Sequence, residues 1–218
     1  MGSTFFIVDL LAYFLKPLHH QFFSCPRSKI LGSALSKFLP ACQDLTGLDV
    51  GCGPGTIAKE IRELRPRISF AGVDVIQRLQ SETRHLIDFQ TYDGHRLPYA
   101  DKTYSFSMLI DVLHHTDSPK QLLAEASRVA QDFILIKDHI SDSQLDKLVL
   151  SLMDWVGNKS YGVHLPYNYL ASRQWQSLFN DLNLTVEGKL EDLALYTGPL
   201  NYVFGRKLHF IAKLKIKR

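Results

Sequence analysis

The sequence predicts an α/β fold in which helices cover a mostly parallel sheet. From residue 41 onward, short apolar runs alternate with segments of helical length, which is the pattern of repeated strand and helix units. Four of the first five apolar runs end in Asp or Cys where a loop begins. Parallel sheets bind ligands at the carboxyl ends of their strands, so we expect a functional site at that edge.

Each expected element follows from its periodicity. Strands are predicted at residues 47–52, 68–75, 85–93, 104–111 and 133–138, and helices at 56–64, 118–130 and 172–182. The helix at 118 has a serine cap, a proline in its first position and Gln121 where a capping box requires it. Two more strands follow. The last, 208–216, alternates strictly, as in an antiparallel strand with one wet face, with Leu208, Phe210, Ala212, Leu214 and Ile216 on its apolar side.

Two helical segments precede the sheet. Residues 5–23 are apolar, but Asp9, Lys16 and Pro17 interrupt them well before the roughly 20 residues that span a bilayer. They also lack the basic start and cleavage site of a signal peptide. A second helical pattern covers residues 29–40 and stops at Pro40. We therefore predict a helical cap over residues 1–40 and one larger domain over 41–218, with a peripheral membrane contact of the first segment as the alternative.

Composition excludes several classes of protein. The net charge is +3 and the basic residues are spread along the chain, so no nucleic-acid partner is predicted. Cys25, Cys42 and Cys52 are odd in number and lack CxxC spacing, which argues against a disulfide framework and favours a reducing cytoplasm. The sequence does not indicate an oligomeric state.

The stretch "LDVGCGPG", residues 48–55, carries three glycines in five positions, Gly51, Gly53 and Gly55. A glycine-rich turn between a strand and a helix directs backbone N–H groups and the positive helix end at a ligand. A dinucleotide site requires G-x-G-x-x-G, whereas this turn reads G-x-G-x-G. Asp49 would repel pyrophosphate and pair with an ammonium group. The turn therefore favours a cationic ligand, and an NAD(P)-dependent oxidoreductase stays as the alternative.

Two further acids stand at the ends of the next strands. Asp74 follows the turn by about 20 residues, where a carboxylate can accept both ribose hydroxyls. Asp93 ends the third strand, where it can accept a hydrogen bond from an exocyclic amine such as that of adenine. One acid each for an amine, a ribose and a base describes S-adenosylmethionine.

With "LDVGCGPG", "DG..LP" and "DVLHH" in this order, the chain resembles the class I S-adenosylmethionine-dependent methyltransferases, in particular their small-molecule subgroup. The resemblance runs from about Leu45 to the C-terminus. It implies a Rossmann-like three-layer α/β/α sandwich whose seven-stranded sheet is mostly parallel with an antiparallel last strand. It also implies methyl transfer with S-adenosylhomocysteine as product; a non-catalytic S-adenosylmethionine-binding protein is a further alternative. The implied cofactor residues are Asp49, Gly51, Cys52, Gly53 and Gly55 around the methionine portion, Asp74 and Val75 at the ribose, Asp93 and Gly94 at the adenine, and Asp111 and Val112 along the cofactor.

The acceptor side is predicted from residues near the fourth and fifth strands. His115 or His114 can supply a base if the acceptor carries a proton, the alternative being that they only pack and cap the loop. Together with Asp111, Asp138 and His139 they are metal-ligand types, but no tight ligand spacing appears, so no metal site is predicted. We expect a small-molecule acceptor in a pocket, or else beneath a packed lid, formed by His139, Trp155, Asn158, Tyr167 and Asn168, with Tyr161 and Tyr169 nearby.

Overall fold

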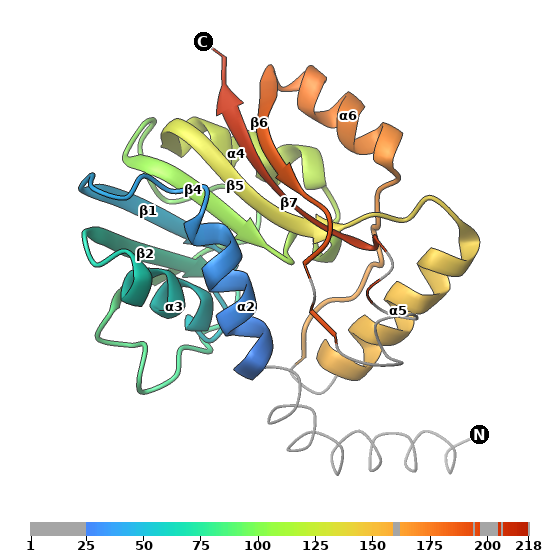
Figure 1. Ribbon diagram of the computed structural model, residues 1–218, viewed down its shortest axis with the longest axis horizontal. Coiled ribbons are helices and arrows are strands. Elements are labelled where there is room, and N and C mark those ends of the chain that lie inside the picture. The colour runs from blue at the N-terminus through green and yellow to red at the C-terminus, as the bar shows by residue number, and fades with distance from the viewer. Residues whose placement is uncertain (1–24, 159–161, 194, 197–204, 206, 218) are drawn as a thin grey trace.

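The computed structural model describes residues 25–158, 162–193, 195–196, 205 and 207–217 (Figure 1). Seven strands form one sheet in the order β3-β2-β1-β4-β5-β7-β6. They are β1 (Leu45–Val50), β2 (Ile68–Asp74), β3 (Ile87–Thr91), β4 (Tyr104–Ile110), β5 (Ala130–His139), β6 (Leu184–Leu190) and β7 (His209–Ile216). The predicted α/β class and seven-stranded sheet are confirmed. The segment 5–23 and Tyr161 lie outside the described residues.

Helices cover both faces of this sheet. They are α2 (Cys25–Ser36), α3 (Thr56–Leu64), α4 (Pro119–Val129), α5 (Gln144–Asn158) and α6 (Ser172–Asp181), with one 3₁₀ turn, η2 (Leu113–His115). Figure 1 shows α2 and α3 on one face and α4 and α6 on the other, which gives the three predicted layers. The helix α2 packs into the same core as α3 and the sheet, and the division of the chain at residue 40 stays a prediction.

The strand directions bring distant residues to one edge. The strands β1, β2, β3, β4 and β5 run parallel, whereas β7 is antiparallel to both β5 and β6. Because β7 starts where β5 ends, His209 pairs in register with His139. The carboxyl ends of β1, β2, β4 and β5 and the first residue of β7 therefore share one edge.

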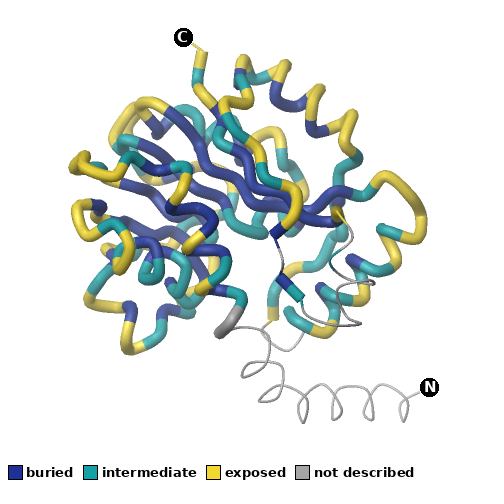
Figure 2. The backbone as a smooth tube through the Cα atoms, viewed as in Figure 1, coloured by how far each residue is buried: buried dark blue, intermediate teal, exposed yellow. Residues whose placement is uncertain are grey.

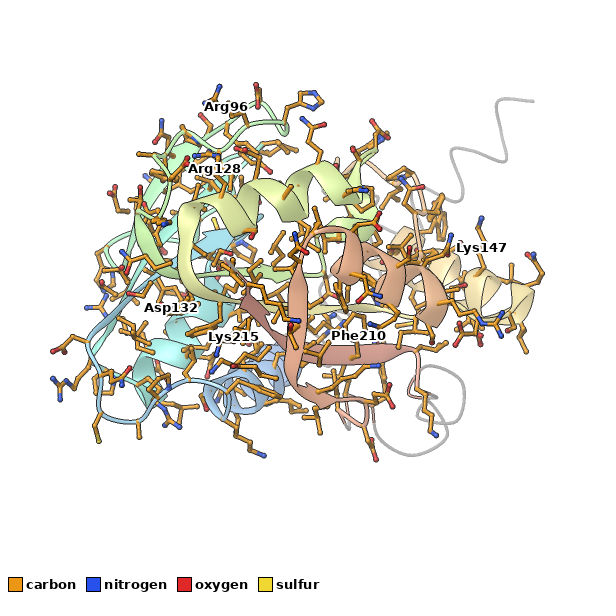
Figure 3. All side chains as sticks on the ribbon, turned by 90° about the horizontal axis from the view of Figure 1, so that it is seen from above. Arg96, Arg128, Asp132, Lys147, Phe210 and Lys215 are labelled. Carbon is orange, nitrogen blue, oxygen red and sulfur yellow. The ribbon has the colours of Figure 1, made fainter. Side chains whose placement is uncertain are left out.

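Two apolar clusters hold the layers together; each combines alternate strand side chains from one face of the sheet with the inner sides of the helices that cover that face. On the α2 and α3 side, Phe106 stacks on Phe133 with 5.1 Å between ring centroids and meets Phe70 edge-on at 5.9 Å. On the other side, Trp175 of α6 contacts Phe210 of β7 edge-on, with 5.1 Å between ring centroids. Figure 3 labels Phe210 on this strand. Figure 2 shows the central strands buried and the helix surfaces exposed.

Three local predictions were wrong in detail. The second face of β7 is not wet along its whole length, since His209 and Ile211 are buried; β7 is an interior strand, with β6 beyond it. Ser118 is the N-cap of α4 and Pro119 its first residue, but the Ser118 side chain makes no capping hydrogen bond, so the capping box is absent. Ala130 begins β5 and does not end α4.

The helix α5 was not predicted; of its residues, the sequence singles out only Trp155 and Asn158, for the acceptor pocket or lid. It buries Leu150 and Asp154 and exposes Leu145, Leu148 and Leu152, of which Leu148 is 66% exposed. Figure 3 shows Lys147 on its outer side. Within the described residues, no helix has the length and apolar character needed to cross a membrane.

Candidate functional site

The glycine turn after β1 adopts a conformation that side chains resist. Gly51, Gly53 and Gly55 have φ angles of 71°, 52° and 76°, in the left-handed region. A Cβ atom on Gly51 would lie 2.5 Å from Cγ2 of Val112, so Gly51 also permits close packing against the end of β4. A Cβ atom on Gly53 would have only the Arg78 guanidinium within 4 Å, at 3.6 Å. The turn therefore presents an open face at Gly53.

Two buried acids flank this turn from adjacent strands. Asp74, 4% exposed, accepts hydrogen bonds from the N–H of Gly53 at 2.8 Å and from the N–H of Ile76 at 3.1 Å. Asp49 is 2% exposed, and burial, followed by the charge of Asp74, raises the pKa of Asp49 to about 8. Nη2 of Arg78 lies 3.6 Å from Oδ2 of Asp74, so Arg78 forms an ion pair with Asp74. A positively charged ligand at the turn would favour the ionised form of Asp49.

The predicted adenine acid lies at the surface. Asp93 follows β3 by two residues, and its Oδ1 accepts hydrogen bonds from the N–H groups of His95 at 2.8 Å and Arg96 at 3.0 Å. The hydrogen bonds from Arg96 and His95 lower the pKa of Asp93. Gly94 has a φ of 84° and approaches Val75, which is exposed at the end of β2. Both hydrogen bonds use one oxygen of Asp93 and fix the turn that follows.

The end of β4 carries a partly buried ion cluster. Asp111 has a φ of 57°, and its Oδ2 accepts a hydrogen bond from Nη2 of Arg27 in α2 at 2.6 Å. Its Oδ1 pairs with Nζ of Lys137, a lysine of β5 with no exposed surface, which also lies 3.2 Å from Nδ1 of His209. Burial alone would raise the pKa of Asp111, but Arg27 and Lys137 hold it well below its usual value. The cluster connects α2 to the carboxyl edge of the sheet.

His114 lies between two carboxylates. Its Nδ1 is 2.6 Å from Oδ1 of Asp138, and Oδ2 of Asp138 accepts a hydrogen bond from the N–H of Leu113, which fixes the turn η2. Its Nε2 is 3.3 Å from Oδ2 of Asp154, and the same oxygen accepts a hydrogen bond from the hydroxyl of Tyr169. Burial would lower the pKa of His114, but Asp138 and then Asp154 raise it to about 10.

The neighbouring histidines are kept neutral. The His115 ring lies 4.0 Å from the His114 ring, and burial, together with the His114 charge, lowers the pKa of His115 to about 4. Nδ1 of His115 is buried and has no hydrogen-bond partner among the described residues. Burial, Lys137 and His114 lower the pKa of His139 as well. At neutral pH, His114 is therefore charged and the adjacent His115 is neutral.

A family model described as "Methyltransferase domain" matches residues 12–188. The chain belongs to the methyltransferase family. Together with the seven-stranded sheet, this match places the protein in the class I S-adenosylmethionine-dependent group, as the resemblance predicted.

Individual relatives of this methyltransferase are distant. Over 87 residues it is 31% identical to the ubiquinone/menaquinone biosynthesis C-methyltransferase UbiE of Desulfotalea psychrophila, a match that covers 38% of this chain and 35% of that protein. The chain thus spans about a third of the length of this curated relative. Among solved structures, a chain in the complex of the Haloferax volcanii Trm112 methyltransferase activator with a putative methyltransferase shares its fold, with a TM-score of 0.67, 13% identity and coverage of 96% and 94% of the two chains. An S-adenosylmethionine-dependent methyltransferase from Aquifex aeolicus also shares the fold, with a TM-score of 0.59 and 16% identity. That match covers 94% of this chain and 98% of the other.

The predicted site residues of the methyltransferase fall into two groups at one edge of the sheet. The glycine turn, Asp49 and Asp74 form the first; Asp111, His114, His115 and His139 form the second. Asn168 joins the second group through hydrogen bonds from its Nδ2 to the carbonyl of Thr116 at 2.8 Å and from its N–H to the carbonyl of His114 at 3.2 Å. Trp155 and Asn158 lie half-buried on α5, and Tyr167 packs near Leu150 and Leu208.

Several residues of the two groups were missed from sequence. Lys137 had a local signal, since a lysine inside the apolar run "FILIKD" is out of place unless it is paired. Arg27 and Asp154 had none, because each reaches its partner from a distant helix. Arg78 follows β2 by four residues and looks in sequence like an ordinary surface residue.

Proposed function

We propose that this methyltransferase transfers the methyl group of S-adenosylmethionine to a small-molecule acceptor and releases S-adenosylhomocysteine. One observation carries the proposal: a left-handed glycine turn lies between two buried acids, Asp49 and Asp74, at the ends of adjacent strands. This donor is a sulfonium with an ammonium group and no phosphate, so buried carboxylates stabilise it where they would repel a dinucleotide.

Each part of the cofactor has a proposed partner. Asp49 accepts the ammonium group, and the first-turn amides of α3, which has no side-chain cap, bind the carboxylate. Asp74 accepts the ribose hydroxyls in addition to its two backbone donors. The remaining proposed contacts are Gly51, Cys52, Gly53 and Gly55 at the methionine portion, Val75 at the ribose, Asp93 and Gly94 at the adenine, and Asp111 and Val112 beside the methyl donor.

The acceptor is proposed to bind at the histidine side of the edge. A lone pair of the acceptor attacks the methyl carbon in line with the sulfur, the carbon–sulfur bond breaks, and its electron pair stays on sulfur. We propose that His115, which is neutral, takes up the proton of the acceptor, that the charged His114 lies beside it, and that the acceptor pocket is shaped by His139, Trp155, Asn158, Tyr167 and Asn168. A cytoplasmic location is part of the same proposal.

Ligand-dependent thermal unfolding tests the cofactor. S-adenosylhomocysteine is expected to raise Tm in a concentration-dependent way, because a ligand that binds only the folded state stabilises it, whereas NAD is expected to leave Tm unchanged. Labelled S-adenosylmethionine is then incubated with a metabolite extract of the producing cell. Label in a small product supports the proposal; a shift by NAD alone contradicts it. Tight S-adenosylhomocysteine binding without any transfer supports the non-catalytic alternative.

Replacement of Asp74 by Ala is expected to weaken S-adenosylhomocysteine binding by roughly 10- to 100-fold, since hydrogen bonds to a charged group contribute about 1.5–3 kcal/mol. Isothermal titration measures the loss. Asp88→Ala is the matched control, because Asp88 is an exposed acid on the neighbouring strand β3.

A second ligand distinguishes the loss of a ribose contact from a disturbance of the glycine turn. Asp74 also binds the N–H of Gly53, so Asp74→Ala disturbs the turn itself. The 2′-deoxy analogue of S-adenosylhomocysteine should bind wild type more weakly than the parent compound and bind Asp74→Ala equally to it. An unchanged penalty for the analogue in the variant would show that Asp74 does not contact the ribose.

A further inference from the structure

Two ring nitrogens at the histidine pair are buried without a hydrogen bond. Among the described residues, Nε2 of His114 and Nδ1 of His115 have no hydrogen-bond partner, although His114 is only 1% exposed. Oδ2 of Asp154 lies 3.3 Å from Nε2 of His114, in a geometry that makes no hydrogen bond. Nε2 of His114 is still opposite the carboxylate of Asp154, whereas Nδ1 of His115 has no such partner; because an unsatisfied buried polar atom is costly, this end of the pair calls for a ligand.

The three side chains have the donor atoms and the spacing of a metal site. His114, His115 and Asp154 each offer one ligand atom, and the three atoms lie within 4.8 Å of one another. Two imidazoles and a carboxylate are a donor set for Zn²⁺ and neighbouring divalent ions. They come from only two elements, η2 and α5.

A supporting shell around these side chains is already in place. Asp138 lies 2.6 Å from Nδ1 of His114, and metal-bound histidines typically donate their other ring N–H to a carboxylate. Tyr169 donates its hydroxyl to Asp154 and its ring faces that of His114 at 5.5 Å. Both contacts orient a ligand before any ion arrives.

The nearby charges favour metal binding at His114, His115 and Asp154 over a second, neighbouring group of possible ligands. Asp111, His114 and His139 also approach one another, but Asp111 is already neutralised by Arg27 and Lys137. Within the described part of the chain, Asp138 and Asp154 form ion pairs with histidines only. Arg27 and Lys137 act on Asp154 and Asp138 through their charges without forming an ion pair with either, so a divalent cation would balance two buried carboxylates whose ion pairs are made by histidine.

We propose that His114, His115 and Asp154 bind one divalent transition-metal ion, with Zn²⁺ as the best match, and that Asp138 positions His114 for it. The ion takes the place of a proton on Nε2 of His114, which is released to solvent. Three protein ligands leave a fourth position for water or for an acceptor atom. Binding of the ion is independent of the methyl donor; its use toward the acceptor rests on the proposed function.

Metal titration of the full chain tests the site. The protein is stripped with a chelator and desalted, and Zn²⁺ is added in competition with a chromophoric chelator. We expect one ion per chain, a rise in Tm with Zn²⁺, and the absorption bands of tetrahedral coordination when Co²⁺ replaces Zn²⁺. Folded wild-type protein without a stoichiometric ion would overturn the proposal.

Variants locate the ion. His115→Gln and Asp154→Asn are each expected to weaken Zn²⁺ binding by at least about 10-fold, and Asp138→Asn by roughly 10- to 100-fold as a change outside the ligand set. The sequence contains one other adjacent histidine pair, so the double variant His19→Gln, His20→Gln is the matched control. Unchanged binding in His115→Gln and Asp154→Asn, or its loss in the control alone, would contradict the assignment. If one variant fails to fold, the other and the Co²⁺ spectrum still decide.

The same samples separate this proposal from the methyl-transfer proposal. S-adenosylhomocysteine binding is measured with and without Zn²⁺. Metal binding without cofactor binding would support the metal site and contradict the cofactor; the reverse would contradict the metal site alone.

Discussion

The variant Asp49→Asn is expected to be more stable than wild type in the absence of cofactor, by several kcal/mol at pH 8. In the folded protein, burial and Asp74 raise the pKa of Asp49 from 3.8 to about 8. Between pH 4 and 8, Asp49 is therefore protonated in the folded protein and ionised in the unfolded chain. The free energy of unfolding of wild type falls by up to about 1.4 kcal/mol for each pH unit in this range. Asparagine does not titrate and avoids this loss.

Urea unfolding of both proteins at pH 5, 6, 7 and 8 measures the effect. The gain in unfolding free energy of Asp49→Asn over wild type should grow with pH and level off above pH 8. Above that pH the wild-type carboxyl is ionised in both the folded and the unfolded protein. Asp93→Asn is the control of opposite sign: backbone hydrogen bonds lower the pKa of Asp93, so its charged form favours folding. A constant difference between Asp49→Asn and wild type across this range would show that Asp49 is ionised in the folded protein.

The same substitution should weaken S-adenosylhomocysteine binding by roughly 10- to 100-fold, because a charge-assisted contact to the ammonium group is lost. 5′-Methylthioadenosine lacks that group and should bind both proteins alike. Equal losses for the two ligands would place Asp49 away from the ammonium. A more stable but weaker-binding variant is the expected signature of a residue retained for its ligand.

The sheet and the glycine turn were predictable because they follow from local rules. The runs at 68–75 and 104–111 match β2 and β4 to within a residue, since buried parallel strands appear as continuous apolar segments. The turn was predictable because a left-handed φ at Gly51, Gly53 and Gly55 excludes most other residues. Both features depend on neighbours in sequence.

The helix α5 and the histidine cluster were not predictable in the same way. α5 has apolar residues on several sides, exposes Leu145 and Leu148 and buries Asp154, so no clean stripe marks its inner face. The partners of His114 come from β5, from α5 and from Tyr169 in the following loop. Their meeting depends on the strand order and on the packing of α5, which no short stretch of sequence encodes.

The variant Asp111→Ala is expected to lower the free energy of unfolding by about 3–5 kcal/mol, the range for breaking a buried ion pair by removing one partner. Lys137 has no exposed surface and would keep its charge without a carboxylate in contact, or would have to lose its proton. Arg27 would lose the carboxylate that connects α2 to β4. Chemical denaturation without cofactor measures the change.

An exposed ion pair provides the contrast. Arg67 and Asp44 approach as closely, with nitrogen–oxygen distances of 2.6 Å and 2.8 Å, but both side chains are more than half exposed. Asp44→Ala should leave stability nearly unchanged, because solvent screens the pair in the folded protein. A loss as large as that of Asp111→Ala would mean that short distance, and not burial, sets the effect.

The order of three variants then distinguishes a buried unpaired charge from a merely missing contact. Lys137→Met leaves Asp111 paired with Arg27, so it should destabilise the protein less than Asp111→Ala. Adding Lys137→Met to Asp111→Ala should restore part of the lost stability, because the double variant no longer buries an uncompensated ammonium group. If the two losses simply added, the lysine would not be the source of the penalty, and Arg27 would remain as the group that needs the Asp111 carboxylate.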